Sequence, residues 1–396
     1  MQRRNVLIGQ SGGPTAVINA SLAAVVKQAT RSKKVDRVYG MRFGVEGLLK
    51  GHLVDLTELP PERLTRLART PSSALGSSRH KLSDDELPQV LEQLRRWNVA
   101  YLFMIGGNDT METIHRVEQH CAEEHFPIHG IGIPKTVDND LFGTDHTPGY
   151  PSAARYVALS ALQGGRLACD MQRVDQYLIL QTVGRDAGWL PAAAAAARKR
   201  EGDAPHLIYV PEAPMHRDTF LQEATNCIDR NGWVSIVCGE GVIWDDGTPV
   251  SASSTSDRFS NIEYGAMAGT GAALHLHRLL AEYTGFRGEF QIPESLPMCA
   301  ADRVSELDRK EAAACGREAV RLALAGASGL MVGMARRPGA YAVEYTTVPL
   351  QEVARRTKPM PNEYLADHRR DVSPEFLAYV RPLIGELPEH ESLHDL

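Results

Sequence analysis

The sequence has few cysteines, and none of them is placed to bind a metal or to build a disulfide framework. Its 6 cysteines are scattered along 396 residues, with no Cys-x-x-Cys pair and no closely spaced histidine partner. This spacing indicates neither a zinc site nor a small disulfide-stabilised fold. Scattered thiols are typical of a reducing compartment, so we expect a cytoplasmic protein.

Positive charge and long apolar runs are also lacking. Lys and Arg number 43 against 49 Asp and Glu, a formal net charge of −6, which argues against a broad surface for nucleic acid or anionic membrane. No run approaches the roughly 20 apolar residues of a membrane span, and the basic N-terminus turns glycine-rich too early for a signal peptide. We therefore expect no nucleic-acid partner and no membrane partner. Any anionic ligand must be bound by local positive groups.

The sequence does contain a regular alternation of short apolar runs, bounded by glycine, and longer amphipathic stretches. This rhythm is typical of an α/β protein, and we expect two doubly wound, mostly parallel sheets with helices on both faces. The expected strands are residues 5–9, 36–40, 101–105, 130–133, 177–181, 206–210, 233–238 and 330–334. The expected helices are residues 16–30, 84–97, 110–123, 152–163, 189–199, 218–231, 268–283 and 306–324.

The chain is long enough for more than one domain, since a domain takes roughly 150 residues and the chain has 396. We expect a first domain over residues 1–150, to which C-terminal elements return, and a second domain over residues 151–396 that ends in an acidic tail. Ligands of an open parallel sheet bind beyond the carboxyl ends of its strands. The turns after the strands are therefore the places to search for chemistry.

Glycine-rich turns follow two of the expected strands. The first contains Gly12 and Gly13, and the second reads Gly-Gly-Asn-Asp-Thr over residues 106–110. Such glycines let backbone N–H groups approach an anion at the start of the following helix. Each turn can equally be a tight turn with a helix cap, and the P-loop pattern GxxxxGK[ST] is absent. The turns alone leave a phosphate site and a purely structural role both open.

The turn after the fourth expected strand is more informative. It reads Pro-Lys-Thr-Val-Asp-Asn-Asp over residues 134–140, so Asp138 and Asp140 lie two residues apart beside Lys135 and Thr136. One carboxylate can accept the proton of an attacking alcohol while the other helps to hold a magnesium ion, and the lysine neutralises the transferred phosphoryl group. The structural alternative is a polar turn held by Asx hydrogen bonds.

With these residues the chain resembles the phosphofructokinase family, and in particular its pyrophosphate-dependent branch. The resemblance runs from the first strand to about residue 365 and rests on several segments in the family's order: residues 12–14 (GGP), 44–48 (GVEGL), 75–79 (LGSSR), 106–110 (GGNDT), 134–140 (PKTVDND), 147–150 (TPGY), 183–190 (VGRDAGWL) and 360–364 (MPNEY). In the ATP-using branch, glycine stands where this chain has Asp109 and Lys135. The resemblance therefore implies a diphosphate donor, a sugar-phosphate acceptor and a reversible transfer.

The resemblance also implies a role for individual residues. Asp138 would be the general base, with Lys135, Thr136 and Asp140 completing the catalytic set. The donor phosphates would be bound by Gly12, Gly13, Arg79, Gly107, Asp109 and Thr110. The acceptor would be bound by Thr136, Asp138, Val183, Gly184, Arg185, Glu240 and Arg287. Asn108 and Asp140 would hold Mg²⁺, and family members pair their subunits, which implies a homodimer or homotetramer.

Three departures from the family pattern bear on the acceptor. The family's arginine that binds the 6-phosphate of fructose 6-phosphate aligns with Met298 of this chain, and an acid, Glu294, lies nearby in the sequence. Where the family has a methionine near the sugar, this chain has Val183. Where much of the family has an aspartate near the metal, this chain has Asn108. An arginine–phosphate contact contributes on the order of 1.5–3 kcal/mol. Fructose 6-phosphate remains the expected acceptor, with a free sugar, a polyol such as myo-inositol or another sugar phosphate as alternatives. A non-catalytic paralogue that binds sugar phosphate is a second alternative.

Overall fold

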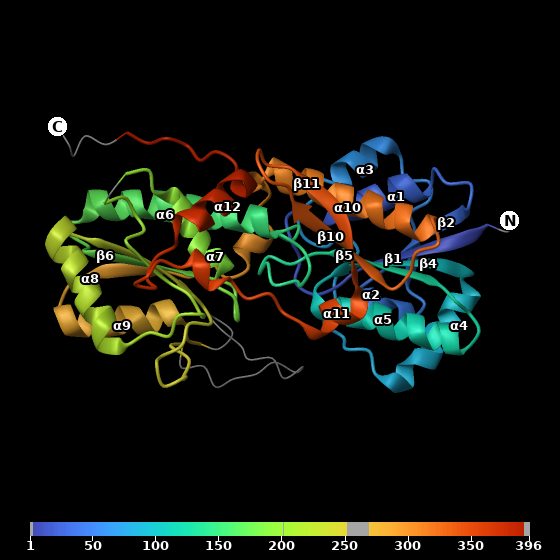
Figure 1. Cartoon of the computed structure of the whole chain (residues 1–396), viewed down its shortest axis with the longest axis horizontal. Coiled ribbons are helices and arrows are strands. Elements are labelled where there is room, and N and C mark those ends of the chain that lie inside the picture. Colours follow the sequence, from blue (N-terminus) through green and yellow to red (C-terminus); the bar gives the residue numbers. More distant parts are fainter. Residues whose placement is uncertain (1–2, 201, 252–268, 392–396) are drawn as a thin grey trace. The chain divides into compact units, whose positions relative to one another are not determined.

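A computed structural model describes residues 3–200, 202–251 and 269–391 of the chain (Figure 1). The chain forms two compact units, each built from two separate stretches of sequence. Unit 1 comprises Met1–Ala153 and Ser295–Pro359, and unit 2 comprises Ala154–Glu294 and Met360–Leu396. Residues 295–359, which follow the second unit in sequence, thus belong to the first.

Unit 1 is centred on a sheet whose described strands number seven, in the order β11-β10-β5-β4-β1-β2-β3. The strands are β1 Arg4–Gln10, β2 Val35–Met41, β3 Leu53–Asp55, β4 Val99–Gly106, β5 His129–Pro134, β10 Leu330–Arg336 and β11 Val343–Pro349. The five inner strands run parallel, and the two edge strands β3 and β11 pair in antiparallel fashion.

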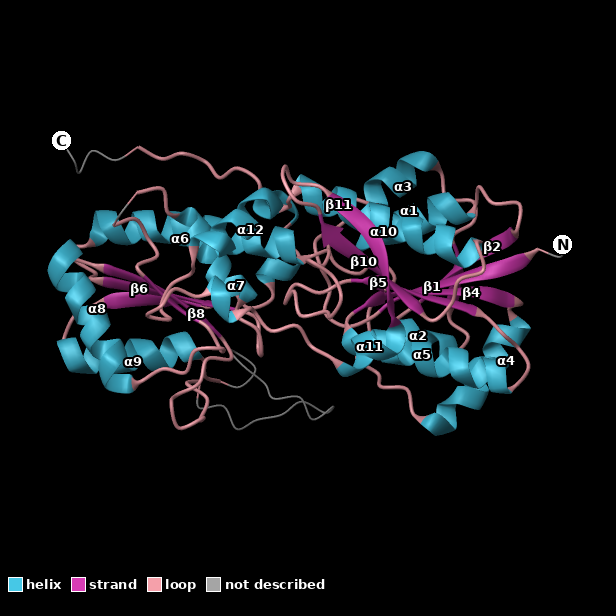
Figure 2. Ribbon diagram, in the orientation of Figure 1, coloured by secondary structure: helices cyan, strands magenta, loops and turns pink. Residues whose placement is uncertain are grey.

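Helices cover both faces of this sheet, as Figure 2 shows. In β1, Val6 and Ile8 pack on one face and Leu7 packs on the other, so the strand is apolar on both sides, as a central parallel strand must be. The first face is covered by α1 Ile18–Ala29, α3 Pro61–Leu67 and α10 Glu306–Leu324. The second is covered by α2 Gly44–Leu49, α4 Leu87–Arg96, α5 Asn108–Glu123 and α11 Leu350–Arg355.

Unit 2 contains a smaller sheet, whose described strands are all parallel in the order β7-β8-β6-β9. Its strands are β6 Tyr177–Thr182, β7 Leu207–Tyr209, β8 Val234–Gly239 and β9 Gly288–Gln291. Its helices are α6 Tyr150–Met171, which starts in unit 1, α7 Trp189–Ala193, α8 Arg217–Asn231, α9 Ala272–Thr284 and α12 Pro374–Ile384. Tyr177 and Ile179 pack against α8 and α9, whereas Leu178 packs against Ala168 of α6, so helices again cover both faces.

The predicted fold class is confirmed, and every expected strand is present within a few residues. The expected helix at 152–163 extends from Tyr150 to Met171, and the expected start of another at Ala268 lies outside the described residues. The missed strands β3, β9 and β11 are edge strands with few buried residues, so they lack a continuous apolar run. Among the described residues, every helix is too short or too polar to cross a membrane.

Candidate active site

Three neighbouring strands of unit 1 end where the sequence placed the donor site. β1, β4 and β5 are adjacent and parallel, with Gln10 opposite Ile105 and Gly106 opposite Pro134. The segments that follow them therefore lie at one edge of the sheet. These segments are the turn at residues 11–14, the turn at 107–110 and the loop at 135–140. The structure thus brings together the three turns that the sequence analysis selected.

The Lys135 side chain connects two of these segments. It is only 3% exposed, and its Nζ donates a hydrogen bond to the backbone oxygen of Gly13 at 2.6 Å. Burial lowers the pKa of Lys135 to about 8, although the Asp138 and Asp140 carboxylates oppose this shift. An ammonium group thus lies beside the glycine turn after β1, where it can neutralise an anion.

The loop that carries the two carboxylates is fixed by its own polar groups. Asn139 is fully buried and left-handed, with φ at 57°, and its Oδ1 accepts a hydrogen bond from the Thr147 backbone N at 3.0 Å. Thr147 Oγ1 donates to the Thr136 backbone oxygen at 3.0 Å. The Asp138 backbone N in turn donates to Thr136 Oγ1 at 3.1 Å. Asp138 and Asp140 therefore flank a buried asparagine in a preorganised turn, whose left-handed backbone asparagine tolerates better than most residues.

Asp140 lies beside a lysine that the sequence analysis missed. Burial raises the pKa of Asp140, while a Thr136 hydrogen bond and the charges of Lys358 and Lys135 act in the opposite direction. The Lys358 backbone N donates to the Asp140 backbone oxygen at 2.7 Å, and Lys358 Nζ donates to the backbone oxygens of Thr144 and Asp145. Its only signal in the sequence was its position just before the segment 360–364.

The described residues offer oxygen ligands that suit a divalent metal. The Oδ1 atom of Asn108 is buried and accepts no hydrogen bond from the residues that the structure describes, which leaves a carbonyl oxygen available at the start of α5. Asp140 supplies a carboxylate after the adjacent strand β5. Within the described part of the chain, no group of three or more His, Cys, Asp or Glu side chains is placed to hold a metal ion. This set fits a divalent cation that keeps several waters and needs few protein ligands.

The other predicted donor residues differ in how they lie. Arg79 follows a loop that is hydrogen-bonded to the first glycine turn, through Ser77 Oγ to the Gly12 backbone oxygen at 2.6 Å, and its charge lowers the pKa of Lys135. Asp109 is exposed in the first turn of α5. Thr110, in contrast, is only 3% exposed, and its side chain fills the space beside Gly106. The side chain of Thr110 therefore has a packing role.

A polar network missed by the sequence analysis supports the segment after this loop. Fully buried His146 contacts Asp145 through Nδ1 and Glu311 of α10 through Nε2. Asp308, one turn earlier in α10, accepts hydrogen bonds from the backbone N atoms of Gly149 and Ser152. Burial raises the pKa of Asp308 to about 6, although these hydrogen bonds act against the shift. Helix α10 therefore holds residues 145–152 by buried polar contacts.

In unit 2, most of the predicted acceptor residues come together. Val183, Gly184 and Arg185 follow β6, and Glu240 follows the adjacent parallel strand β8. The Gly184 backbone N donates to Glu240 Oε1 at 3.3 Å, and Gly184 adopts φ of 117°, which only glycine tolerates. A side chain at Gly241 would collide with the Arg185 backbone oxygen. The turn at residues 183–185 is therefore packed directly against the end of β8.

Arg287 does not join this group within one chain. It directly precedes β9, which pairs in parallel with β6 so that Gly288 lies opposite Tyr177. Arg287 is thus at the amino ends of these strands, away from the turn that follows Thr182, because a parallel register sends the two ends to opposite edges. Its side chain is 77% exposed and lies 3.4 Å from Asp175.

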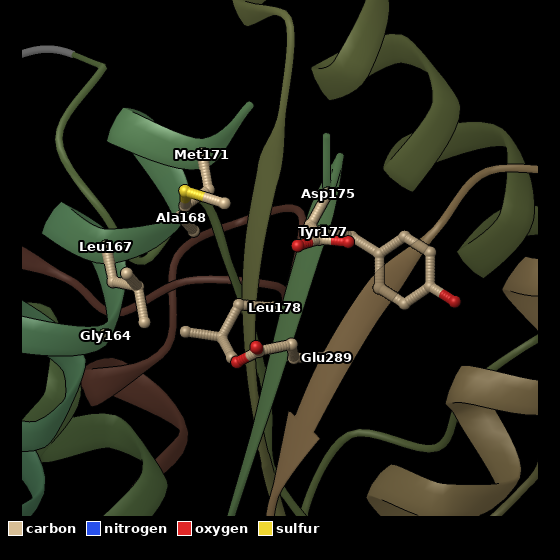
Figure 3. Close-up of a pocket in the computed structure, with 8 residues that line it drawn as sticks. All are labelled: Gly164, Leu167, Ala168, Met171, Asp175, Tyr177, Leu178 and Glu289. Atoms are coloured by element: carbon tan, nitrogen blue, oxygen red, sulfur yellow. The ribbon is translucent and has the colours of Figure 1, made fainter. Parts of the chain in front are cut away.

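Asp175 also lines a small pocket, shown in Figure 3, of about 110 Å³. The walls of this pocket come largely from apolar side chains of α6, including Leu167 and Met171, together with Leu178 of β6. None of the predicted acceptor residues lines it. The pocket therefore gives no support to a sugar-phosphate site at this edge of the sheet.

Met298, which aligns with the family's phosphate-binding arginine, lies near the first glycine turn. It ends a short 3₁₀ helix in unit 1, and its Sδ lies 3.8 Å from the position that a Cβ of Gly13 would occupy. Met298 is therefore a neighbour of the glycine turn after β1. The sequence analysis could not find this contact, because the two residues are far apart in the chain and carry no shared pattern.

Comparison with known proteins decides between the phosphofructokinase resemblance and a chance set of motifs. Residues 5–323 match the family described as Phosphofructokinase. The chain belongs to the phosphofructokinase family. It is 37% identical to the pyrophosphate–fructose 6-phosphate 1-phosphotransferase of Rhodospirillum rubrum, over 100% of this chain and 98% of that protein. Membership confirms the prediction of a phosphotransferase enzyme.

Two further proteins similar to this phosphofructokinase-family chain are named for the substrates they use. A sulfofructose kinase from Alkalicoccus urumqiensis is 35% identical over 92% of each chain. The crystal structure of a pyrophosphate-dependent phosphofructokinase from Marinobacter aquaeolei superimposes with a TM-score of 0.87 at 32% identity, covering 98% of this chain and 94% of that one. The predicted relation to the pyrophosphate-dependent branch is thus confirmed. Phosphotransferases of this family work with a divalent metal.

Proposed function

We propose that the chain transfers a phosphoryl group reversibly from diphosphate to the C1 hydroxyl of fructose 6-phosphate. The observation that carries the proposal is the buried Lys135 ammonium, which lies beside the glycine turn after β1 and the two loop carboxylates. A lysine there adds a cation for a small, charge-dense donor. The full-length relatives named pyrophosphate–fructose 6-phosphate 1-phosphotransferase support the same donor.

In this proposal catalysis is positioning combined with charge neutralisation. Asp138 accepts the proton of the sugar hydroxyl while the hydroxyl oxygen forms a bond to phosphorus. The phosphoanhydride bond of diphosphate breaks at the same time, and the phosphate that leaves carries the electron pair of that bond. Thr136 and Lys135 face the transferred group. Asn108 and Asp140 would hold Mg²⁺, which supplies charge neutralisation on the donor phosphates when it is bound.

Apart from Thr110, whose buried side chain packs beside Gly106, the remaining predicted residues keep their proposed binding roles. Backbone N–H groups at Gly12, Gly13 and Gly107 and the Arg79 side chain bind the donor, and the Asp109 carboxylate takes the place that a nucleotide's α-phosphate would need. Val183, Gly184, Arg185 and Glu240 bind the acceptor. Arg287 can take part only from a neighbouring subunit, which agrees with the proposed homodimer or homotetramer. We place the enzyme in the cytoplasm.

One observation favours a second acceptor. The family's phosphate-binding arginine aligns with Met298, and a relative of 35% identity is named sulfofructose kinase. A sulfonate carries one negative charge where a phosphate monoester carries close to two at neutral pH, so a site with one cation fewer discriminates less strongly against it. A 6-sulfonated fructose is therefore the second candidate.

The test is a matrix assay of the purified protein with Mg²⁺. Diphosphate and ATP are crossed as donors with fructose 6-phosphate, 6-deoxy-6-sulfofructose, free fructose and myo-inositol as acceptors. The proposal expects turnover with diphosphate and fructose 6-phosphate. Ready use of ATP with no use of diphosphate would overturn the donor, and preference for the sulfonated sugar would move the acceptor. No turnover with any pair would favour the non-catalytic paralogue.

A further inference from the structure

Glu212, in the loop after β7, joins two segments that are distant in sequence. A single oxygen of its carboxylate, Oε1, accepts hydrogen bonds from the Gly188 backbone N at 2.9 Å and from the Met360 backbone N at 3.0 Å. Gly188 precedes the short helix α7, and Met360 is the first residue of the returning stretch of unit 2. Both segments resemble family motifs, and the proposed mechanism gives no role to Gly188 or to residues 360–364.

The second carboxylate oxygen shows how tightly this contact is built. Glu212 Oε2 is buried and accepts no hydrogen bond within the described residues. A Cβ at Gly188 would lie 2.6 Å from this oxygen and 2.5 Å from Val210 Cβ. The carboxylate therefore occupies the space that a side chain at residue 188 would need. A buried carboxylate with one unsatisfied oxygen is unfavourable for stability, which suggests that it serves another purpose.

The clamp formed by Glu212 with the backbone N atoms of Gly188 and Met360 lies next to the proposed acceptor turn at residues 183–185. β7 is parallel to β8, with Tyr209 opposite Cys238, so Glu212 follows the strand ends at the same edge of the sheet as Glu240. Residues 183–185 are held on one side by Glu240, through the Gly184 backbone N. Glu212 holds the chain three residues beyond Arg185, at the Gly188 backbone N. The segment from Gly184 to Gly188 is thus hydrogen-bonded to a carboxylate at each end.

Other contacts make residues 360–369 a rigid support for the clamp. Arg369 Nη2 donates to the Glu212 backbone oxygen at 2.9 Å and to Asn362 Oδ1 at 3.1 Å. The ring of Trp189, next to Gly188, packs edge-on against Tyr364 with centroids 5.8 Å apart. This segment therefore contacts both Glu212 and the residue next to Gly188.

We propose that Glu212 is a positioning residue for the acceptor, which orients the turn at residues 183–185 by tying Gly188 to Met360. This inference rests on the proposed function, because it takes that turn to bind the sugar. Glu212 contacts no reacting group in this scheme. Its removal loosens the turn and weakens acceptor binding, while binding of the diphosphate donor in unit 1 is unchanged.

The test compares steady-state kinetics of three Glu212 variants with diphosphate and the best acceptor from the matrix assay. Glu212→Met removes both hydrogen-bond acceptors at similar size, and Glu212→Asp shortens the side chain so that it no longer reaches both backbone N–H groups. Both are expected to raise the KM for the acceptor about tenfold or more, with the KM for diphosphate within twofold of wild type. Glu212→Gln keeps the Oε1 acceptor and is expected to restore the acceptor KM to within threefold.

Asp203 provides a matched control in the same unit. Its Oδ2 also accepts two backbone hydrogen bonds, from Lys199 at 2.9 Å and Arg200 at 2.8 Å, but it is not bonded to the acceptor turn. Asp203→Asn should leave both KM values unchanged. A merely structural role for Glu212 would lower the amount of active enzyme, and hence the apparent kcat, without changing the KM for the acceptor.

The outcomes separate this inference from the proposed function. Unchanged acceptor KM in Glu212→Asp and Glu212→Met, with an active wild type, overturns the positioning role and leaves the function standing. Equal increases in both KM values overturn it as well. If Glu212→Met does not fold, Glu212→Asp and Glu212→Gln still decide the question. A wild type inactive with diphosphate refutes the proposed function before any variant is compared.

Discussion

Substitution of Gly107 tests whether a donor phosphate occupies the space beside the turn after β4. A Cβ at Gly107 would meet nothing closer than the Lys135 backbone oxygen at 3.9 Å, and Gly107 has φ of −92°, which alanine tolerates. Gly107→Ala should therefore fold as wild type does. If a donor phosphate accepts a hydrogen bond from this backbone, the added methyl group blocks its approach. Loss of one such charge-assisted hydrogen bond amounts to about 1.5–3 kcal/mol, or about a tenfold to hundredfold increase in the KM for diphosphate.

The preceding glycine is the control. A Cβ at Gly106 would collide with the buried side chain of Thr110, so Gly106→Ala must push the first turn of α5 away from the sheet. Overpacking of this kind costs about 1–3 kcal/mol, and each kcal/mol lowers the melting temperature of a domain of this size by roughly 2–4 °C.

Thermal unfolding and steady-state kinetics, measured on both variants, separate the two effects. Gly106→Ala should lower the melting temperature by roughly 2–12 °C, whereas Gly107→Ala should leave it unchanged and alter only the KM for diphosphate. The reasoning fails if Gly107→Ala binds diphosphate normally, or if it is destabilised as much as Gly106→Ala.

Three further predictions follow from the same region. Asp138→Asn should lower kcat by about a hundredfold to ten-thousandfold with the KM for diphosphate within threefold; a kcat near wild type would exclude Asp138 as the base. Lys135→Met should raise the KM for diphosphate more than tenfold while that for the acceptor changes little, and an equal rise in both would contradict its assignment to the donor. Asp308 has a folded pKa of about 6 against 3.8 for an ordinary aspartate, so the folded state keeps a proton that the unfolded state loses. The stability contributed by protonated Asp308 is full below pH 3.8 and falls as the pH rises to about 6, by roughly 3 kcal/mol. In urea unfolding, the stability of wild type relative to Asp308→Asn should therefore fall over this range, and a constant difference would disprove the shift.

The fold and the centre of the candidate site were predictable because both depend on local patterns. Strands apolar on both faces indicate a parallel sheet, and the parallel sheet then predicts that the turns after β1, β4 and β5 meet at one edge. Lys135 and Asp138 could be selected because unlike charges within one loop are visible in the sequence. Gly184 and Glu240 were selected through the family resemblance alone, and the structure joins them by a hydrogen bond.

Other features could not be predicted, because they depend on strand register and on contacts between distant segments. Nothing in the sequence around Arg287 indicates that β9 is parallel to β6. This pairing alone places Arg287 at the edge of the sheet opposite the turn at residues 183–185. Lys358 and Glu212 act through backbone groups far away in the chain, and a hydrogen bond to a backbone oxygen or N–H leaves no mark on the partner's residue type. Met298 was aligned with the family's phosphate-binding arginine from the sequence. Its place beside Gly13 follows from the return of residues 295–359 to unit 1.

This return has a consequence for synthesis of the protein on the ribosome. The face of β5 that carries Ile131 and Ile133 is covered in part by Cys315 and Val320 of α10, and β5 gains its second neighbour only with β10. Unit 2 likewise needs α12, because Trp189 packs against Phe376 and Tyr379. Neither unit can complete its core until almost the whole chain has emerged. The nascent polypeptide therefore exposes apolar strands for most of its translation, which makes chaperone protection important.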